Sequence, residues 1–224
     1  MKVLKFGGTS VGTPQRMKEV SKLITSDGKS KMVVLSAMSG TTNTLVEISD
    51  YLYKKNPEGA NTIINRLEQT YIRHAKDIYA TDEWREKTIQ FLHEEFDYLR
   101  SFTKIHFTSF EEKVILAQGE IMSTNMVTNY MLECGVKAIL LPALDIIRTD
   151  KNSEPDLNYM KEKDITALKE NPGYDVYITQ GFICRNAYGE IDNLQRGGSD
   201  YTACLIGESL FLTILCIYYC ITSI

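Results

Sequence analysis

The chain has 224 residues, 43% of them hydrophobic, which is enough to bury one core, so a single domain is the first expectation. Its formal net charge is -4, and the Lys and Arg residues are scattered among Asp and Glu. This charge balance argues against nucleic acid as a partner, because binding a phosphate backbone requires a surplus of positive charge.

The chain opens with a strand, a glycine-rich loop and a helix. Residues 2–6 are apolar except for lysine and predict a strand, which passes into the loop 7–10. Thr13 is the expected cap of the helix that follows, with Pro14 in its first turn. Residues 32–35 predict a second strand before a small polar stretch and another helix. This repeated unit is typical of α/β folds.

The middle of the chain has a helical pattern. Apolar residues recur at helical spacing from about 60 to 104, which predicts a helical insertion in the α/β core. Ser109 and Glu112 have the spacing of a capping box, so a helix is expected from there to Glu133, with Gly135 ending it.

Three further strands are expected in the last third. Residues 136–141 and 175–179 predict buried strands, 191–194 could form another, and 150–158 is a polar, turn-rich connection. The last run leads into Arg-Gly-Gly-Ser-Asp at 196–200, where Ser199 or Asp200 is the expected cap of a helix.

The end of the chain differs in composition from the rest. Residues 209–224 contain no charged residue, proline or glycine. Sixteen residues are fewer than the roughly 20 that a membrane helix needs, so no membrane span is expected. We interpret 208–224 as an aberrant hydrophobic tail, with a buried strand as the alternative.

The cysteines and histidines do not predict a metal site. The five cysteines show no C-x-x-C spacing, and no signal peptide precedes them, which favours reduced thiols in a cytoplasm. The three histidines lie far apart in the sequence and near no cysteine. No metal-ligating residues are therefore assigned.

The two glycine-rich loops are the candidate phosphate sites. Residues 7–10 and 197–199 each follow an expected strand and precede a helix, so backbone N–H groups can face an anion. Neither loop has the spacing of a P-loop or of a Rossmann fingerprint. Each also fits an ordinary tight turn.

Four charged residues lie beside these loops or on the central helix. Lys5 is costly to bury in an apolar strand without a partner such as a phosphate, although a lysine facing water is the alternative. Glu120 lies on an otherwise apolar helix, where a solvated position is equally open. Arg196 and Asp200 flank the second loop and fit either a carboxylate site or a simple ion pair.

Five segments, taken in order, resemble the aspartokinases over roughly residues 1–207. They are Lys-Phe-Gly-Gly-Thr-Ser-Val at 5–11, Val-Val-Leu-Ser-Ala-Met-Ser-Gly-Thr-Thr-Asn at 33–43, Gly-Glu-Ile-Met-Ser at 119–123, Thr-Gln-Gly-Phe at 179–182 and Arg-Gly-Gly-Ser-Asp at 196–200.

The resemblance implies an amino acid kinase fold, which is a three-layer α/β/α sandwich with a mainly parallel sheet. Residues 1–207 would form the catalytic domain, with the acceptor lobe first and an incomplete nucleotide lobe after it. The implied reaction transfers the γ-phosphoryl group of ATP, with Mg2+, to the β-carboxylate of L-aspartate. This reaction is the first step towards lysine, threonine and methionine. The resemblance also implies a cytoplasmic protein whose full-length relatives are homo-oligomers.

The same resemblance assigns site residues by motif. Lys5 and Asp200 would be catalytic, with Lys5 at the transferring phosphoryl group and Asp200 holding that lysine or the Mg2+ shell. Arg196 would bind the α-carboxylate and Glu120 the ammonium group of aspartate. The aspartate pocket would be lined by Ser36, Thr42, Glu120, Phe182, Arg196 and Ser199, and the phosphates would be held by Lys5, Gly7, Gly8, Ser10, Gly197 and Gly198.

Two features depart from the family pattern. Gln195 stands where the family usually has glycine, and a later Thr-x-Asp-Pro-Arg segment and regulatory ACT domains are not in the sequence. We therefore expect a C-terminally truncated catalytic domain with little activity of its own. The alternatives are another amino acid kinase, such as an acetylglutamate or glutamate kinase, and a non-catalytic fragment.

Overall fold

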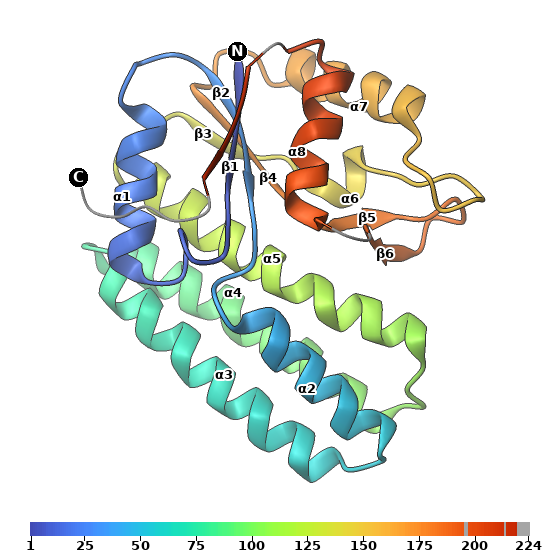
Figure 1. The fold of residues 1–224 in the computed structure, drawn as a ribbon. Coiled ribbons are helices and arrows are strands. Elements are labelled where there is room, and N and C mark those ends of the chain that lie inside the picture. Colours follow the sequence, from blue (N-terminus) through green and yellow to red (C-terminus); the bar gives the residue numbers. More distant parts are fainter. Residues whose placement is uncertain (195–196, 213, 219–224) are drawn as a thin grey trace.

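A five-stranded parallel sheet forms the centre of the computed structural model (Figure 1). The structure describes residues 1–194, 197–212 and 214–218. The strands of the sheet lie in the order β3-β4-β2-β1-β7, and every neighbouring pair is parallel. Their bounds are β1 Lys2–Phe6, β2 Lys31–Leu35, β3 Ala138–Leu140, β4 Val176–Gln180 and β7 Leu215–Tyr218.

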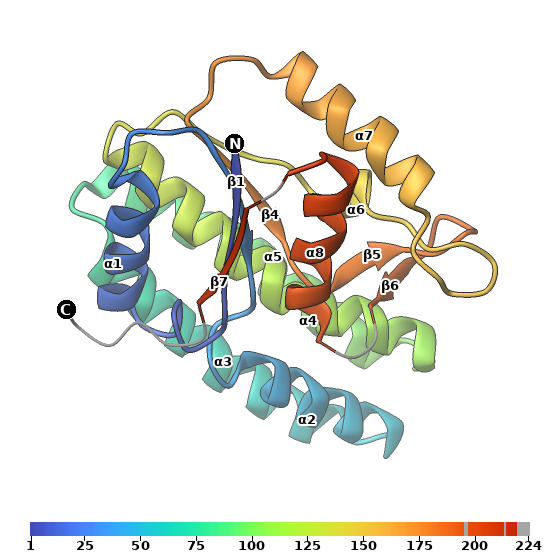
Figure 2. The ribbon, with the colours of Figure 1, turned by 45° about the horizontal axis from the view of Figure 1, so that its top comes forward.

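Helices cover both faces of this sheet, as Figures 1 and 2 show. Helices α1 to α5 pack on one face and α6 to α8 on the other. Their bounds are α1 Pro14–Thr25, α2 Thr41–Tyr53, α3 Pro57–Ile78, α4 Asp82–Ser101, α5 Ser109–Glu133, α6 Ala143–Ile146, α7 Leu157–Glu170 and α8 Gly198–Ser209. The expected three-layer α/β architecture is confirmed.

The strands alternate their side chains between the two helical layers. On β1, Leu4 and Phe6 pack against α1 to α5, whereas Val3 packs against the layer that contains α8. On β2, Val33 and Val34 divide in the same way. Because both faces are covered, the central strands are apolar throughout, and Lys5 falls on the α8 side of β1.

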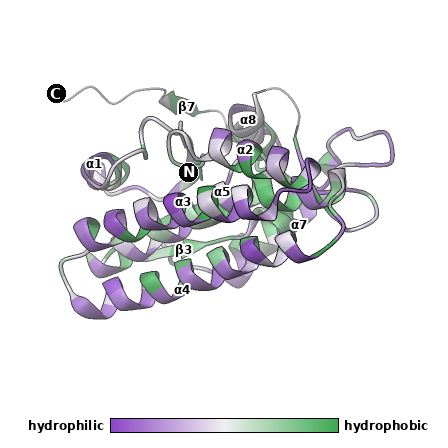
Figure 3. Cartoon of the chain, turned by 90° about the horizontal axis from the view of Figure 1, so that it is seen from below, coloured by the Kyte–Doolittle hydropathy of each residue, from purple (hydrophilic) through white to green (hydrophobic). Residues whose placement is uncertain are grey.

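The helices α3 and α4, with a short 3-10 turn at Phe102–Lys104, run through the interval 60–104 for which a helical insertion was predicted. Viewed from below in Figure 3, α4 is largely hydrophilic where it turns away from the sheet, and strand β3 is hydrophobic. The apolar side chains of the pair, such as Leu67, Tyr71, Leu92 and Phe96, pack into the core against α2 and α5.

Helix boundaries confirm one local prediction and correct two. Thr13 does cap α1, because its hydroxyl accepts from the Arg16 amide at 3.3 Å. The capping box of α5, however, is formed by Thr108 and Glu111, one residue earlier than predicted. Helix α8 begins with Gly197 as its N-cap at φ +75°, so neither Ser199 nor Asp200 is the cap.

A small antiparallel pair stands apart from the main sheet. Strand β5, Ile183–Arg185, pairs with β6, Ile191–Asn193. The strand predicted at 191–194 therefore forms, but outside the central sheet. Helix α7 begins directly after the turn-rich connection. Asp156 caps this helix, because its carboxylate accepts a hydrogen bond from the Tyr159 amide at 3.0 Å.

The part of the hydrophobic tail that the structure describes is packed against the fold. Helix α8 runs through Ser209, and β7 pairs with β1 in the register Val3 to Leu215 through Phe6 to Tyr218. The Phe6 and Tyr218 rings stack at 4.8 Å. A strand therefore forms at 215–218, although its residues are half-buried rather than buried, and residues 219–224 lie outside the described range. The interpretation of 208–224 as aberrant stays a prediction. Among the described residues, no helix is both long and apolar enough to cross a bilayer.

Candidate active site

A cavity of about 340 Å³ opens at the carboxyl ends of β1, β2 and β4. Parallel sheets place their ligand sites at this edge, because the loops after several strands meet there. The residues that line the cavity come from five separate segments of the chain; they are Gly8, Ser36, Ala37, Met38, Ser39, Gly40, Thr42, Asn43, Glu120, Phe182, Gly198 and Ser199.

The cavity brings together most residues that the motifs singled out. Five of the six predicted substrate residues line it, namely Ser36, Thr42, Glu120, Phe182 and Ser199, together with the loop residues Gly8 and Gly198. Arg196, the sixth, lies outside the described residues, as does Gln195. Lys5, Gly7, Ser10, Gly197 and Asp200 are not among the lining residues.

Hydrogen bonds hold the segment after β2 in place. The Ser123 hydroxyl of α5 donates to the Ser36 carbonyl at 2.7 Å, and the Ser36 hydroxyl donates to the Ser199 hydroxyl at 2.9 Å. The Ser39 amide donates to the Gly8 carbonyl at 3.1 Å. A Cβ at Gly8 would lie 2.8 Å from the Ala37 carbonyl oxygen, so only glycine permits this approach.

The turn after β4 packs directly on the start of α8. Phe182 adopts φ +69°, and its amide donates to the Thr202 hydroxyl at 3.0 Å. A Cβ at Gly181 would meet Ser199 at 2.4 Å, and a Cβ at Gly198 would meet the Phe182 side chain at 2.6 Å. The two glycines therefore let the turn and the helix close one wall of the cavity.

Two helices point their N-termini at this cavity. Helix α2 begins after Gly40 and helix α8 after Gly197, and neither start has a side-chain cap. The partial positive charge of a helix N-terminus favours an anion. A hydrogen bond to the inserted helices holds the first turn of α2 in place. It joins the Thr41 hydroxyl and the buried Tyr71 hydroxyl, which lie 3.0 Å apart.

Glu120 is the one carboxylate that lines the cavity in the described part of the chain. Its side chain is only 3% exposed, and Oε2 has no hydrogen-bond partner among the described residues. Burial raises the pKa of Glu120 to about 8, although the backbone amides of Ala37 and Glu120 act in the opposite direction. A cationic group bound beside Glu120 would restore its ionised form.

Lys5 and Asp200 join the two glycine-rich loops. The Lys5 ammonium on β1 lies 2.6 Å from the Asp200 carboxylate in the first turn of α8, and Lys5 is 5% exposed. Asp200 thereby supplies the partner that burial of Lys5 requires. The ion pair lies between the first strand and the helix that borders the cavity.

The structure places Gly7 and Ser10 against β7 rather than in the cavity. The Gly7 amide donates to the Tyr218 carbonyl at 3.0 Å, and the Ser10 hydroxyl reaches the same oxygen at 3.4 Å. Ser10 is fully buried. The assignment of these two residues to phosphate stays a prediction.

Sequence reasoning missed several residues of the site. Ala37, Met38, Ser39, Gly40 and Asn43 also line the cavity, and their signal was the small polar stretch after the second strand. Tyr71 gave no signal, because it is one of many apolar positions on a helix. No group of three or more His, Cys, Asp or Glu within the described ranges has the geometry to hold a metal ion.

The amino acid kinase family model matches residues 1–218. Lysine-sensitive aspartokinase 3 of Escherichia coli K12 is 30% identical over 211 residues, covering 93% of this chain and 46% of that protein. The aspartokinase of Chlamydia muridarum is 33% identical over 212 residues, covering 92% of this chain and 45% of its own length. The chain therefore spans about half the length of the curated relatives it matches.

Solved structures agree with this match. E. coli aspartokinase III in complex with aspartate and ADP aligns with a TM-score of 0.83 at 26% identity, over 98% of this chain and 49% of that one. Clostridium acetobutylicum aspartate kinase aligns with a TM-score of 0.78 at 20% identity, over 96% of this chain and 47% of that one, which supports the fold alone. Because the family model covers nearly all of its residues, the chain belongs to the amino acid kinase family.

Proposed function

We propose that this chain contains the aspartate-binding part of an aspartokinase, which transfers the γ-phosphoryl group of ATP to the β-carboxylate of L-aspartate and forms 4-phospho-L-aspartate. The observation that carries the proposal is the environment of Glu120. A single buried carboxylate with an unpartnered oxygen lines a cavity that also contains hydroxyl groups and two helix N-termini. This combination suits a ligand with one ammonium group and two carboxylates.

Each group of aspartate has a matching partner on this wall. Glu120 would accept a hydrogen bond from the ammonium group, because a buried carboxylate needs a bound cation to offset the cost of burying its charge. The start of α2 near Thr42 and the start of α8 near Ser199 would bind the carboxylates through N–H and hydroxyl groups. Arg196 is proposed to bind the α-carboxylate from its position just before α8.

The reaction needs no general base. The attacking β-carboxylate has an ordinary pKa near 3.9 and is ionised at neutral pH. The protein has instead to align two anions and to offset the charge on the phosphoryl oxygens. Lys5 is suited to that task, because the sheet and α8 bury it beside the cavity.

The residues beside the cavity fit a nucleotide phosphate. Gly198 and Ser199 bring the uncapped N-terminus of α8 to the cavity, Gly8 lines the same cavity, and Lys5 is paired with Asp200 in the first turn of α8. When bound, ATP supplies the phosphoryl group and Mg2+ neutralises part of its charge. With Asp200 as the nearby carboxylate, Mg2+ would be held mainly by the phosphates themselves, as is usual for this ion.

The relatives support aspartate over other acceptors. The two relatives described above are aspartokinases, and the E. coli aspartokinase III structure described above holds aspartate and ADP. The charge pattern of the cavity agrees with an acceptor that retains a cationic ammonium. An acylated amino group, as in N-acetylglutamate, would leave Glu120 without a cation.

Calorimetry of aspartate binding tests the role of Glu120. At pH 7 a carboxyl group with a pKa near 8 is mostly protonated, so binding of an ammonium group should release close to one proton. The affinity for aspartate should rise between pH 6 and 8, at most about tenfold per pH unit. Succinate, which lacks the ammonium group, should show neither effect.

Glu120→Gln is the matched variant, and Glu208→Gln, an exposed carboxylate on α8, is its control. We expect the first to remove proton release and the pH dependence, and the second to keep both. Formation of aspartyl hydroxamate in the presence of MgATP and hydroxylamine reports phosphoryl transfer. If glutamate or N-acetylglutamate binds more tightly than aspartate, the proposed acceptor is wrong.

A further inference from the structure

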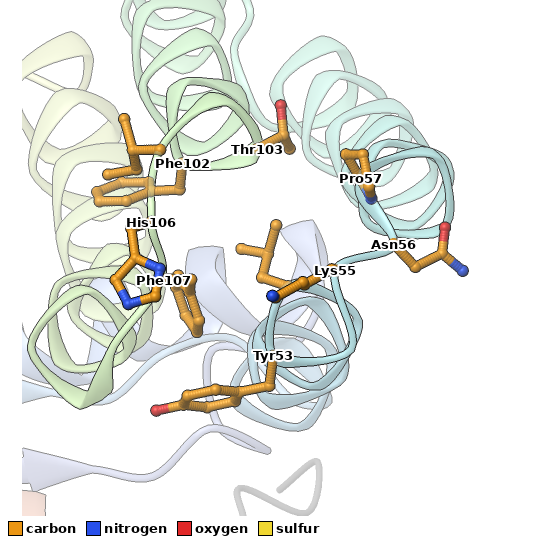
Figure 4. A pocket seen from close by; sticks show the side chains of 10 residues that line it. Tyr53, Lys55, Asn56, Pro57, Phe102, Thr103, His106 and Phe107 are labelled. Atoms are coloured by element: carbon orange, nitrogen blue, oxygen red, sulfur yellow. The ribbon is translucent and has the colours of Figure 1, made fainter.

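A second cavity, of about 430 Å³, lies at the opposite end of α2 from the candidate active site (Figure 4). It forms where the end of α2, the start of α3 and the connection from the 3-10 turn to α5 meet. It shares no lining residue with the first cavity. Thr42 of the first cavity and Leu52 of the second lie near opposite ends of α2, about 15 Å apart along the helix.

The walls of this second cavity are mainly apolar and aromatic. Leu52 and Phe102 form buried surfaces, and the Tyr53 and Phe107 rings pack edge to face at 4.8 Å. Ile105 lines the same cavity with 54% of its surface exposed. Exposed apolar side chains gathered around a concavity of this size are typical of a ligand site.

The charged groups of the lining are basic. Lys55 and His106 come from the two sides of the cavity, one after α2 and the other before α5, as Figure 4 shows. None of the described lining residues is an Asp or Glu. The ionisable side chains of the lining itself are therefore opposite in sign to the net charge of the chain.

The nearest carboxylates on α5 already have partners. Glu112 accepts from the Tyr53 hydroxyl at 2.8 Å, and Glu111 accepts from the Thr108 amide at 2.8 Å within the capping box. The hydrogen bond from the Thr108 side chain is the main cause that lowers the pKa of Glu111, and His106 makes a smaller contribution in the same direction. Lys55 is therefore the main cation of the lining.

We propose that this second cavity binds a small carboxylate with an aromatic or branched apolar body. The apolar body would lie against Phe102, Phe107 and Ile105, and the carboxylate would face Lys55 with His106 opposite. The absence of an acid in the described lining disfavours an added ammonium group. The proposal does not depend on the activity assigned to the first cavity.

Titration of the full chain with 3-phenylpropionate, followed by calorimetry and by amide shifts in NMR spectra, tests this site. We expect saturable binding with amide shifts confined to 52–57 and 102–107. Phenethylamine, which has the same ring and the opposite charge, should not bind at this cavity. Saturating aspartate should leave the affinity for phenylpropionate unchanged, because the two cavities share no residue.

Two variants distinguish the charge from the apolar wall. Lys55→Asn removes the cation at a residue with φ +53°, a conformation that asparagine tolerates, and should weaken binding about three- to fivefold. Ile105→Ala trims an exposed wall and should weaken binding by a similar factor. Lys54→Asn, at an exposed neighbour outside the lining, is the control and should leave the affinity within twofold.

Several results would overturn the proposal. No saturable binding up to about 10 mM phenylpropionate would do so, since a dissociation constant above that concentration is too weak to indicate a specific site. Equal binding of phenethylamine would contradict the anionic assignment. If aspartate displaces phenylpropionate, the phenylpropionate site is the first cavity. If the Lys55→Asn and Lys54→Asn variants bind phenylpropionate with equal affinity, the second cavity is excluded as its site.

Discussion

The two glycine-rich loops have similar sequences but different tertiary roles. Gly7 and Gly8 are packed inside the fold, with the Gly7 amide bonded to the Tyr218 carbonyl and Gly8 pressed against the Ala37 carbonyl. Gly197 and Gly198 start α8, and although Gly8 and Gly198 both line the candidate active site, only the second loop places a helix N-terminus there. A Cβ at Gly197 would meet no atom within 4 Å.

The difference follows from the distance between each loop and its helix. Helix α1 begins at Pro14, several residues after the first loop, and the Thr13 hydroxyl caps it. Helix α8 begins inside the second loop without a side-chain cap. An uncapped helix start keeps its N–H groups for a ligand, whereas a loop that crosses a strand end uses its N–H groups within the fold.

Alanine substitution in each loop should give the largest contrast. Gly8→Ala forces a Cβ to within 2.8 Å of a backbone oxygen, so we expect the free energy of unfolding to fall by about 2 to 3 kcal/mol. Gly197→Ala meets only the strain of φ +75°, about 1 kcal/mol. Urea denaturation of both variants measures this. Equal losses would mean that the first loop is as open as the second.

Lys5→Met tests the ion pair that joins the loops. Lys5 would act mainly on charge that develops in the transition state, so phosphoryl transfer in the hydroxamate assay should slow by roughly a hundredfold. The affinity for aspartate should change much less. A rate within about threefold of the parent would remove Lys5 from the proposed chemistry.

The serines of the two loops should separate binding from stability. Ser199→Ala removes a hydroxyl from the cavity and the acceptor of the Ser36 hydroxyl, so aspartate affinity should fall about three- to tenfold. Ser10→Ala removes a buried, long hydrogen bond to Tyr218 and should cost about 0.5 to 1 kcal/mol of stability with aspartate affinity unchanged. Calorimetry and urea denaturation report the two quantities. The reverse pattern would assign the phosphate or aspartate contact to the first loop.

Tyr218→Leu should give the smallest effect. It keeps the carbonyl that the first loop uses but removes the stack with Phe6, which is worth about 0.5 to 1 kcal/mol. Hydrogen exchange at the Gly7 amide should become faster by a corresponding factor. Unchanged exchange would mean that β7 does not hold the first loop.

The sequence motifs predicted the residues of the candidate site better than their contacts. Ser36, Thr42, Glu120, Phe182 and Ser199 meet in one cavity because parallel strands end at one edge of the sheet. The partner of Lys5 could not be read locally, since Asp200 lies almost 200 residues away. The predicted cap of α5 was wrong by one residue, because Thr108 and Ser109 compete for the same role. The predicted cap of α8 was wrong by two or three residues, because the helix begins at Gly197 without a side-chain cap.

The sequence by itself determined the α/β class, the inserted helices and the chemistry-bearing residues, because periodicity and short motifs are local properties. Only the tertiary structure decided how each loop meets the cavity, where the hydrophobic tail pairs and how deeply Glu120 is buried. These outcomes depend on contacts between segments distant in the chain, such as β7 with β1 and Tyr71 with Thr41. The energy of a buried charge or of a backbone N–H depends on the groups that contact it in space rather than on the residues next to it in the sequence.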